Sequence, residues 1–185
     1  MSAKLDDLFN LAKTEIKNGD YKKLEAIVTS NKELVNFRQI EKTEKEEFSL
    51  TLLHHAVGFP PGNPPKNATD SIEVLLKNGA DIEALDKLPK GSTPLQNSAG
   101  YNLIDITKLL LENGADPNSN QFHEFGMDAT SLALFEAYTD LVRLLVKHGA
   151  EVTLDVAAGT GNIEQLKIFT ILVLNNDQLV GNNLK

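Results

Sequence analysis

Apolar residues recur along this chain at the spacing of amphipathic helices, and short polar segments separate the helical stretches. Near the start, five apolar side chains between Leu5 and Ile16 fall on one helical face. The polar turn at residues 18–20 stops this helix, and a second amphipathic helix is predicted from about Tyr21 to Ser30. The chain therefore opens with a pair of helices joined by a short turn.

The segment from Gly91 to Asn118 shows the pattern most completely. Thr93-Pro94 is typical of a helix start, because the threonine hydroxyl can cap the helix and a proline in the first turn costs no backbone hydrogen bond. Asn113-Gly114 is typical of a helix end. The residues between these signals fit two short helices and a turn.

Parts of this segment recur at a fixed distance. The tetrapeptides Asn78-Gly79-Ala80-Asp81, Asn113-Gly114-Ala115-Asp116 and His148-Gly149-Ala150-Glu151 follow one another at intervals of 35 residues. A period of this size predicts stacked structural repeats. Each glycine is expected to supply the left-handed residue that ends a helix.

Alignment on these glycines divides the chain into five units within a single domain of residues 1–185. The units cover roughly residues 5–36, 49–84, 91–118, 126–152 and 153–176. The first and last are atypical, as expected of end units that expose one face to water. In the three central units an apolar row on the second helix is expected to stack one repeat on the next: Ile72, Leu75, Leu76; Ile106, Leu109, Leu110; and Leu141, Leu144, Leu145.

Two segments interrupt the pattern. The charged run from Glu41 to Glu47 indicates a solvated loop in a connector at residues 36–49. The second unit is longer than the third, and the excess falls at Phe59–Lys66, where four prolines and a glycine cannot continue a helix. We expect a proline-stiffened loop that protrudes between two helices. A partner recognises this loop, or it reshapes the binding groove, or it is a tolerated insertion, since lengthening a loop costs little.

Composition narrows the class of protein. With 41% apolar and 24% charged residues, the chain has the make-up of a soluble globular protein. Its formal net charge of −8 argues against nucleic-acid binding, which rests on clustered lysine and arginine. A basic or neutral protein partner fits this charge better.

Cysteine is absent from the sequence, which excludes disulfides and thiolate metal sites and fits a reducing compartment. The N-terminal residues lack the apolar core of a signal peptide, and the longest apolar run near the C-terminus, Ile171–Leu174, is too short to span a bilayer. We therefore expect a cytoplasmic protein without membrane association.

The repeated residues resemble the ankyrin repeat family. The matching positions are Gly91, Thr93-Pro94-Leu95, Ala99, Leu109–Leu111 and Asn113–Asn118, with the same frame at Thr51–Ala56 and around Gly149. The resemblance covers nearly the whole chain and implies an all-α solenoid of stacked helix-turn-helix units, each with a projecting hairpin loop, here called a finger. Three residues depart from the family pattern: Gln96 replaces a histidine, Asn102 a glycine and Asp128 a threonine. We expect these changes to weaken individual capping bonds.

The resemblance also implies the family's usual role, which is non-catalytic protein binding on the concave face formed by fingers and first helices. The positions carried over are Lys87, Leu88 and Lys90 in one finger, Phe122, His123, Glu124, Phe125 and Met127 in the next, and Tyr101, Phe135 and Glu136 on the helices. Exposed aromatic residues on such a face are typical contact anchors. Alternatively, Phe122 and Phe125 pack against neighbouring fingers, and Phe135 fills a gap beside a poorly matched helix.

The histidines do not indicate a metal or catalytic site. His54 and His55 are adjacent, so they point to different sides of a helix and cannot chelate together. His54 matches the family's structural histidine, which bonds to the loop backbone. His123 and His148 lie far in sequence from any acidic triad partner. Gly159-Thr160-Gly161-Asn162 lacks the lysine of a phosphate loop and is interpreted as a turn.

We therefore predict a monomeric interaction module that is not an enzyme and has no cofactor or metal. Two alternatives stay open. The chain is a self-associating scaffold that docks through the apolar segment Phe169–Leu174, or a regulatory domain of a larger protein. An enzyme or ligand sensor that uses His54, His55 or His123 has the least support.

Overall fold

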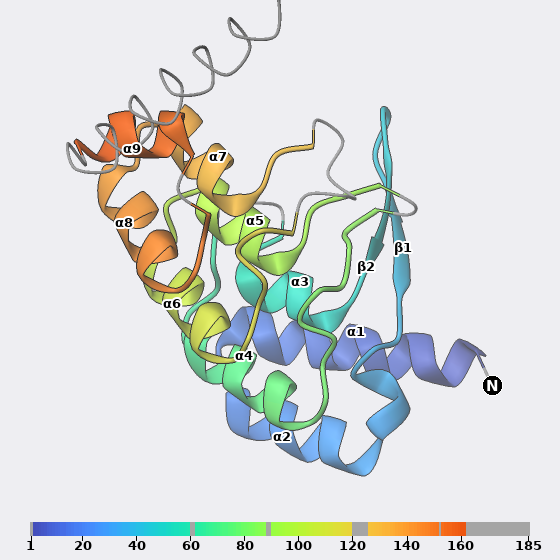
Figure 1. Cartoon of the computed structure of the whole chain (residues 1–185). Helices are drawn as coiled ribbons and strands as arrows, with labels where there is room; N and C mark the ends of the chain where they lie inside the picture. Colours follow the sequence, from blue (N-terminus) through green and yellow to red (C-terminus); the bar gives the residue numbers. More distant parts are fainter. Residues whose placement is uncertain (1, 60–61, 88–89, 120–125, 152, 162–185) are drawn as a thin grey trace, which may run out of the picture.

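The computed structural model describes residues 2–59, 62–87, 90–119, 126–151 and 153–161, and within these ranges the chain is mostly helical (Figure 1). The helices are α1 (Ser2–Asn18), α2 (Tyr21–Ser30), the short 3-10 helix η1 (Lys32–Leu34), α3 (Leu52–Val57), α4 (Ala68–Lys77), α5 (Pro94–Gly100), α6 (Ile104–Glu112), α7 (Ala129–Phe135), α8 (Thr139–Lys147) and α9 (Leu154–Thr160). One hairpin, β1 (Gln39–Lys42) and β2 (Glu47–Leu50), precedes α3.

The helices form two stacked layers. The first helices of successive units contact one another in the order α1, α3, α5, α7, α9, and the second helices in the order α2, α4, α6, α8 (Figure 1). This arrangement confirms the predicted solenoid of paired helices. The second helix predicted for the last unit, from Ile163 to about Leu174, lies outside the described residues.

The predicted apolar rows lie between the layers. In each row two side chains are buried, and the third is partly buried against the core: Leu76, Leu109 and Leu144. Residues far apart in sequence thus share one continuous core, because each helix pair can cover its apolar face only against a neighbouring pair.

The charged connector is a hairpin, not the loop predicted from its charges. Strand β1 pairs with β2 in antiparallel fashion, with Gln39 opposite Leu50 and Lys42 opposite Glu47. The next finger extends this pairing, since the backbone amide of Ser49 donates to the carbonyl of Asp86 at 2.8 Å. Arg38 ties both fingers together through bonds of 2.7 Å to the carbonyls of Ser49 and Leu85. The charge run indicated exposure but not the local pairing of β1 with β2, and the bond from Ser49 to Asp86 joins residues 37 positions apart.

The expectation that departures from the family pattern weaken the helix caps is wrong for Gln96 and Asp128. Gln96 forms a capping box with Thr93. The side-chain Oε1 of Gln96 accepts from the backbone amide of Thr93 at 2.8 Å, and the backbone amide of Gln96 donates to Thr93 Oγ1 at 3.2 Å. Its Nε2 also donates to the carbonyls of Ser119 and Met127. The carboxylate of Asp128 accepts from the Ser131 amide at 2.6 Å. Both replacements retain hydrogen-bonding groups of the right reach.

Residues in left-handed conformation recur every 35 positions at two places: after the second helix of each central unit and in the turn between its two helices. The helix-ending glycines Gly79, Gly114 and Gly149 have φ of 90°, 90° and 98°, as predicted, and no atom lies within 4 Å of a Cβ added to any of them. Their requirement is therefore conformational and not a lack of space. The residues between the paired helices, Asn67, Asn102 and Ala137, have φ of 54°, 55° and 59°.

Ala137 is the strained member of this second set, because alanine has no side-chain group that favours the left-handed region. We expect Ala137→Gly to raise the free energy of unfolding by about 0.5–1 kcal/mol and Gly114→Ala to lower it by a similar amount. Urea unfolding followed by circular dichroism measures both changes. A lower stability of Ala137→Gly would contradict the assignment of strain to this turn.

Candidate functional site

Six of the ten residues proposed for partner binding lie in the described structure: Lys87, Lys90, Tyr101, Met127, Phe135 and Glu136. The other four, Leu88, Phe122, His123 and Phe125, lie outside the described residues, as do Glu124 and the apolar segment invoked for self-association. The candidate surface is therefore built from the helix ends and the bases of the fingers.

Tyr101, Phe135 and Glu136 lie at equivalent ends of two adjacent helices. Tyr101 caps the C-terminus of α5, Phe135 is the last residue of α7, and Glu136 caps that helix. Since α5 packs on α7, these side chains belong to one edge of the stack. Tyr101 is 50% exposed and Phe135 is 79% exposed. The alternative in which Phe135 fills a gap between helices is therefore wrong.

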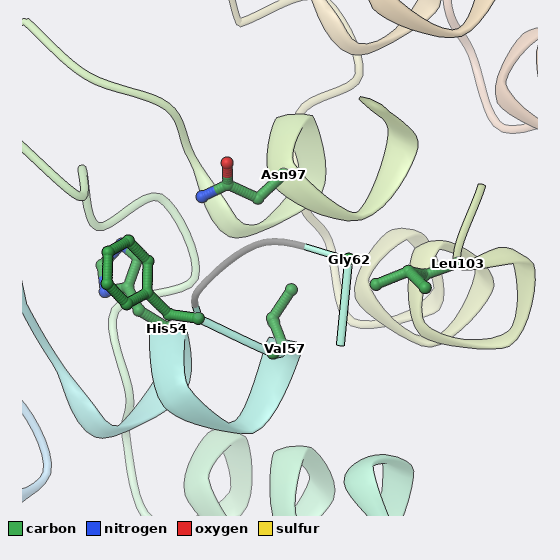
Figure 2. Close-up of a pocket in the computed structure, with 7 residues that line it drawn as sticks. His54, Val57, Gly62, Asn97 and Leu103 are labelled. Atoms are coloured by element: carbon green, nitrogen blue, oxygen red, sulfur yellow. The ribbon is translucent and has the colours of Figure 1, made fainter. Parts of the chain in front are cut away.

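The proline-rich insertion does not simply protrude, because its described part folds back on both neighbouring units. A Cβ on Gly62 would lie 2.7 Å from Cδ1 of Tyr101, and a Cβ on Gly19 would lie 2.7 Å from the carbonyl oxygen of Lys66. Figure 2 shows Gly62 close to Val57 of α3 and Leu103 ahead of α6, around a gap of about 10 Å³. This gap is barely the size of one water molecule, so the contact is tight packing and not a ligand site.

The three described finger residues, Lys87, Lys90 and Met127, differ in their contacts and exposure. Lys87 pairs with Glu46 of the β1–β2 hairpin at 2.7 Å, and its ammonium lies 5.0 Å from the centre of the Phe48 ring. It thereby joins two fingers. Lys90 is exposed, whereas Met127 is partly buried and its carbonyl accepts the bond from Gln96.

His54 has the structural role that the family resemblance implies. Its Nδ1 accepts from the Thr51 amide at 3.0 Å, so the other nitrogen, Nε2, carries the proton and donates to the Ala84 carbonyl at 3.1 Å. Burial lowers the pKa of His54 to about 4, and Arg38 acts in the same direction. The neutral ring thus links α3 to the following finger by a hydrogen bond to Ala84.

His55 differs from its neighbour, and the sequence pointed to it only within the least supported alternative, an enzyme or ligand sensor. Its ring is buried, yet Nε2 makes no hydrogen bond within the described structure. Burial lowers the pKa of His55 to about 3, with a contribution from the Lys13 ammonium. The ring is therefore neutral at pH 7, and the 3.6 Å separation between Nε2 and Glu41 Oε1 is not an ion pair. The only sequence signal was the neighbouring insertion.

Two general findings concern the described residues alone. No group of three or more histidines and carboxylates in those ranges could hold a metal ion. None of the helices described has both the length and the apolar character needed to cross a membrane.

The stacked helix pairs with projecting fingers define a helical repeat protein. The family model for ankyrin repeats matches residues 53–156 with three copies. The chain belongs to the ankyrin repeat family, and ankyrin repeats are protein–protein interaction modules.

Three relatives illustrate the similarity. The chain is 33% identical over 102 residues to a mouse (Mus musculus) B-cell lymphoma 3 protein homolog, and the matched region covers 55% of this chain and 20% of that protein. It is 29% identical over 150 residues to a putative ankyrin repeat protein of Rickettsia bellii, covering 77% and 57% of the two chains. It is 26% identical over 133 residues to human (Homo sapiens) ankyrin repeat and SOCS box protein 11, covering 67% and 38%. The matches span between a fifth and three fifths of these relatives.

Proposed function

We propose that this chain binds a partner protein, without catalysis, on the concave face formed by its fingers and first helices. The contact set comprises the ten predicted positions: Lys87, Leu88, Lys90, Tyr101, Phe122, His123, Phe125, Met127, Phe135 and Glu136. We also propose that the protein is cytoplasmic and monomeric and that its partner is basic or neutral.

The exposure of Phe135 is the observation that carries the proposal. A phenylalanine with 79% of its surface in water forgoes much of the free energy that its burial would supply, so its place at the rim of a stack suits a contact with another molecule. Tyr101 adds a second aromatic ring on the adjacent repeat, and Glu136 adds a charge beside it. The ring of Tyr101 is held by Gly62 of the insertion, which lowers the entropy cost of ordering it in a complex.

The double variant Tyr101→Ala with Phe135→Ala tests this surface. We expect its melting temperature to stay within a few degrees of the wild-type value, because both rings are half or more exposed. We expect loss of the proteins that the intact chain retains in affinity capture with cross-linking and mass spectrometry. Alanine at an aromatic anchor typically weakens a complex by about 2 kcal/mol or more.

Ile104→Ala provides the matched control. Ile104 is also an exposed apolar residue, at 44%, but it begins the second helix α6. This variant should retain every partner. Retention of all partners by the double variant, or an equal loss in the control, would contradict the proposed face.

A further inference from the structure

A second cavity lies between α1, α3, β1 and the proline-rich insertion. It has a volume of about 380 Å³ and is lined by Lys13, Ile16, Lys17, Glu41, His55, Phe59, Asn63 and Pro65. These residues come from α1, β1, α3 and the described part of the insertion, and Figure 1 shows α1, α3 and β1 grouped at the N-terminal end of the stack. Its size falls within the range of small-molecule sites.

The insertion forms one wall of this cavity. Phe59 packs edge-on against His55, with ring centres 6.2 Å apart, and against Phe48 at 4.9 Å. Phe59, Asn63 and Pro65 therefore enclose a space that a shorter, uninterrupted repeat would leave open to solvent. The described part of the insertion thus contributes part of the lining of this cavity.

His55, which lines this cavity, has a buried ring nitrogen, Nε2, whose 3.6 Å separation from Glu41 Oε1 is too long for a hydrogen bond. His55 is only 7% exposed and lines the cavity, and its Nε2 makes no hydrogen bond within the described residues. Leaving a buried polar group without a hydrogen bond costs free energy. A ligand that accepts a hydrogen bond at this nitrogen would recover that cost.

The charges around the cavity favour an anion. Lys13 and Glu41 form an ion pair with each other, so their charges cancel. Lys17 lies one helical turn after Lys13 on α1 and makes no ion pair within the described part of the chain, so the lining carries a net charge of about +1. The remaining wall is apolar, from Ile16, Phe59 and Pro65.

We propose that this cavity binds a small organic carboxylate with an apolar body. The carboxylate accepts hydrogen bonds from the Lys17 ammonium and from His55 Nε2–H, and the apolar body lies against Ile16 and Phe59. Binding needs no titration of His55, because the neutral ring offers its Nε2 proton as a donor.

Titration of the ¹⁵N-labelled chain with phenylacetate, followed by amide NMR spectra, tests the proposal. We expect saturable shifts at the backbone amides of Ile16, Lys17 and His55, with a dissociation constant of order 1 mM for so small a probe. Benzyl alcohol and benzylamine have the same aromatic body without the carboxylate. They should bind at least about tenfold more weakly, because they lose the charge-assisted bond.

Two variants assign the contacts. Lys17→Gln removes the cation and should weaken phenylacetate binding about tenfold, whereas Lys108→Gln removes an exposed lysine on α6 and should leave it unchanged. His55→Leu replaces the donor with an apolar side chain of similar length and should also weaken binding about tenfold. Amide spectra without ligand show whether each variant is folded.

The outcomes are separable. Shifts confined to the cavity, selective for the carboxylate and reduced by both variants support the proposal. Equal binding of benzyl alcohol, unchanged binding by folded Lys17→Gln, or shifts at other residues alone would overturn it. None of these results bears on the contacts proposed for Tyr101 and Phe135, whose test uses different residues.

Discussion

Acidification from pH 7 to pH 5 should lower the free energy of unfolding by about 4 kcal/mol, or about 2 kcal/mol for each of His54 and His55. Both rings are buried and neutral in the folded chain, where burial lowers the pKa of His54 to about 4 and that of His55 to about 3. In the unfolded chain the same rings regain their ordinary pKa near 6.5.

The sign follows from proton uptake. Between pH 6.5 and about 4 the unfolded chain binds protons at both histidines and the folded chain does not, so stability falls as the pH falls. Asp86 opposes this effect at His54, since its charge favours the protonated ring, and Arg38 reinforces it. At His55 the Lys13 ammonium reinforces it. Glu83, whose pKa is raised by burial, acts in the opposite direction.

Urea unfolding at several pH values measures this dependence, and His54→Gln supplies the matched variant. Glutamine already occupies the equivalent position of the next unit, where Gln96 makes both the cap and the loop bonds. His54→Gln should therefore stay folded and lose about half of the pH dependence between pH 7 and pH 5. An unchanged pH profile in this variant would show that His54 is not the titrating group.

Phe9→Ala should lower the free energy of unfolding by about 3–5 kcal/mol, the range typical of a buried aromatic ring. Phe9 has no exposed surface and packs edge-on against His55 of α3, with ring centres 5.7 Å apart. It also contacts Phe37, at 5.8 Å, ahead of the first hairpin. The ring thus joins the first, atypical helix pair to the rest of the stack.

Leu11→Ala on the same helix is the control, because Leu11 is 47% exposed. We expect a change of less than about 1 kcal/mol there. Urea unfolding followed by circular dichroism measures the loss of stability. Amide hydrogen exchange then shows whether Phe9→Ala destabilises the whole stack or releases α1 and α2 alone. A loss no larger than that of Leu11→Ala would contradict the core assignment of Phe9.

Part of the candidate surface was predictable. The positions of Tyr101, Phe135 and Glu136 follow from the repeat frame, since equivalent residues of stacked units share one edge. The role of Lys87 did not follow, because its contacts with Glu46 and Phe48 join fingers about 40 residues apart in the chain. The lack of a hydrogen-bond partner at Nε2 of His55 did not follow for the same reason. Its isolation depends on α1, β1 and the insertion, which approach it only in the folded molecule.

The sequence by itself determined the repeat frame: the 35-residue period, the start at Thr93-Pro94, the left-handed glycines that end the second helices, and the apolar rows. These features are local, because capping, helix termination and helical periodicity depend on residues within one or two turns. Only the structure decided that residues 39–50 pair as strands, that the insertion folds back on its neighbours, and that His55 lines a cavity with its Nε2 unsatisfied. The last two outcomes rest on contacts between distant segments, which no local pattern records. The hairpin is local, but the charged run at residues 41–47 contains no apolar residue to alternate with polar ones as in a typical strand, so the run did not indicate it.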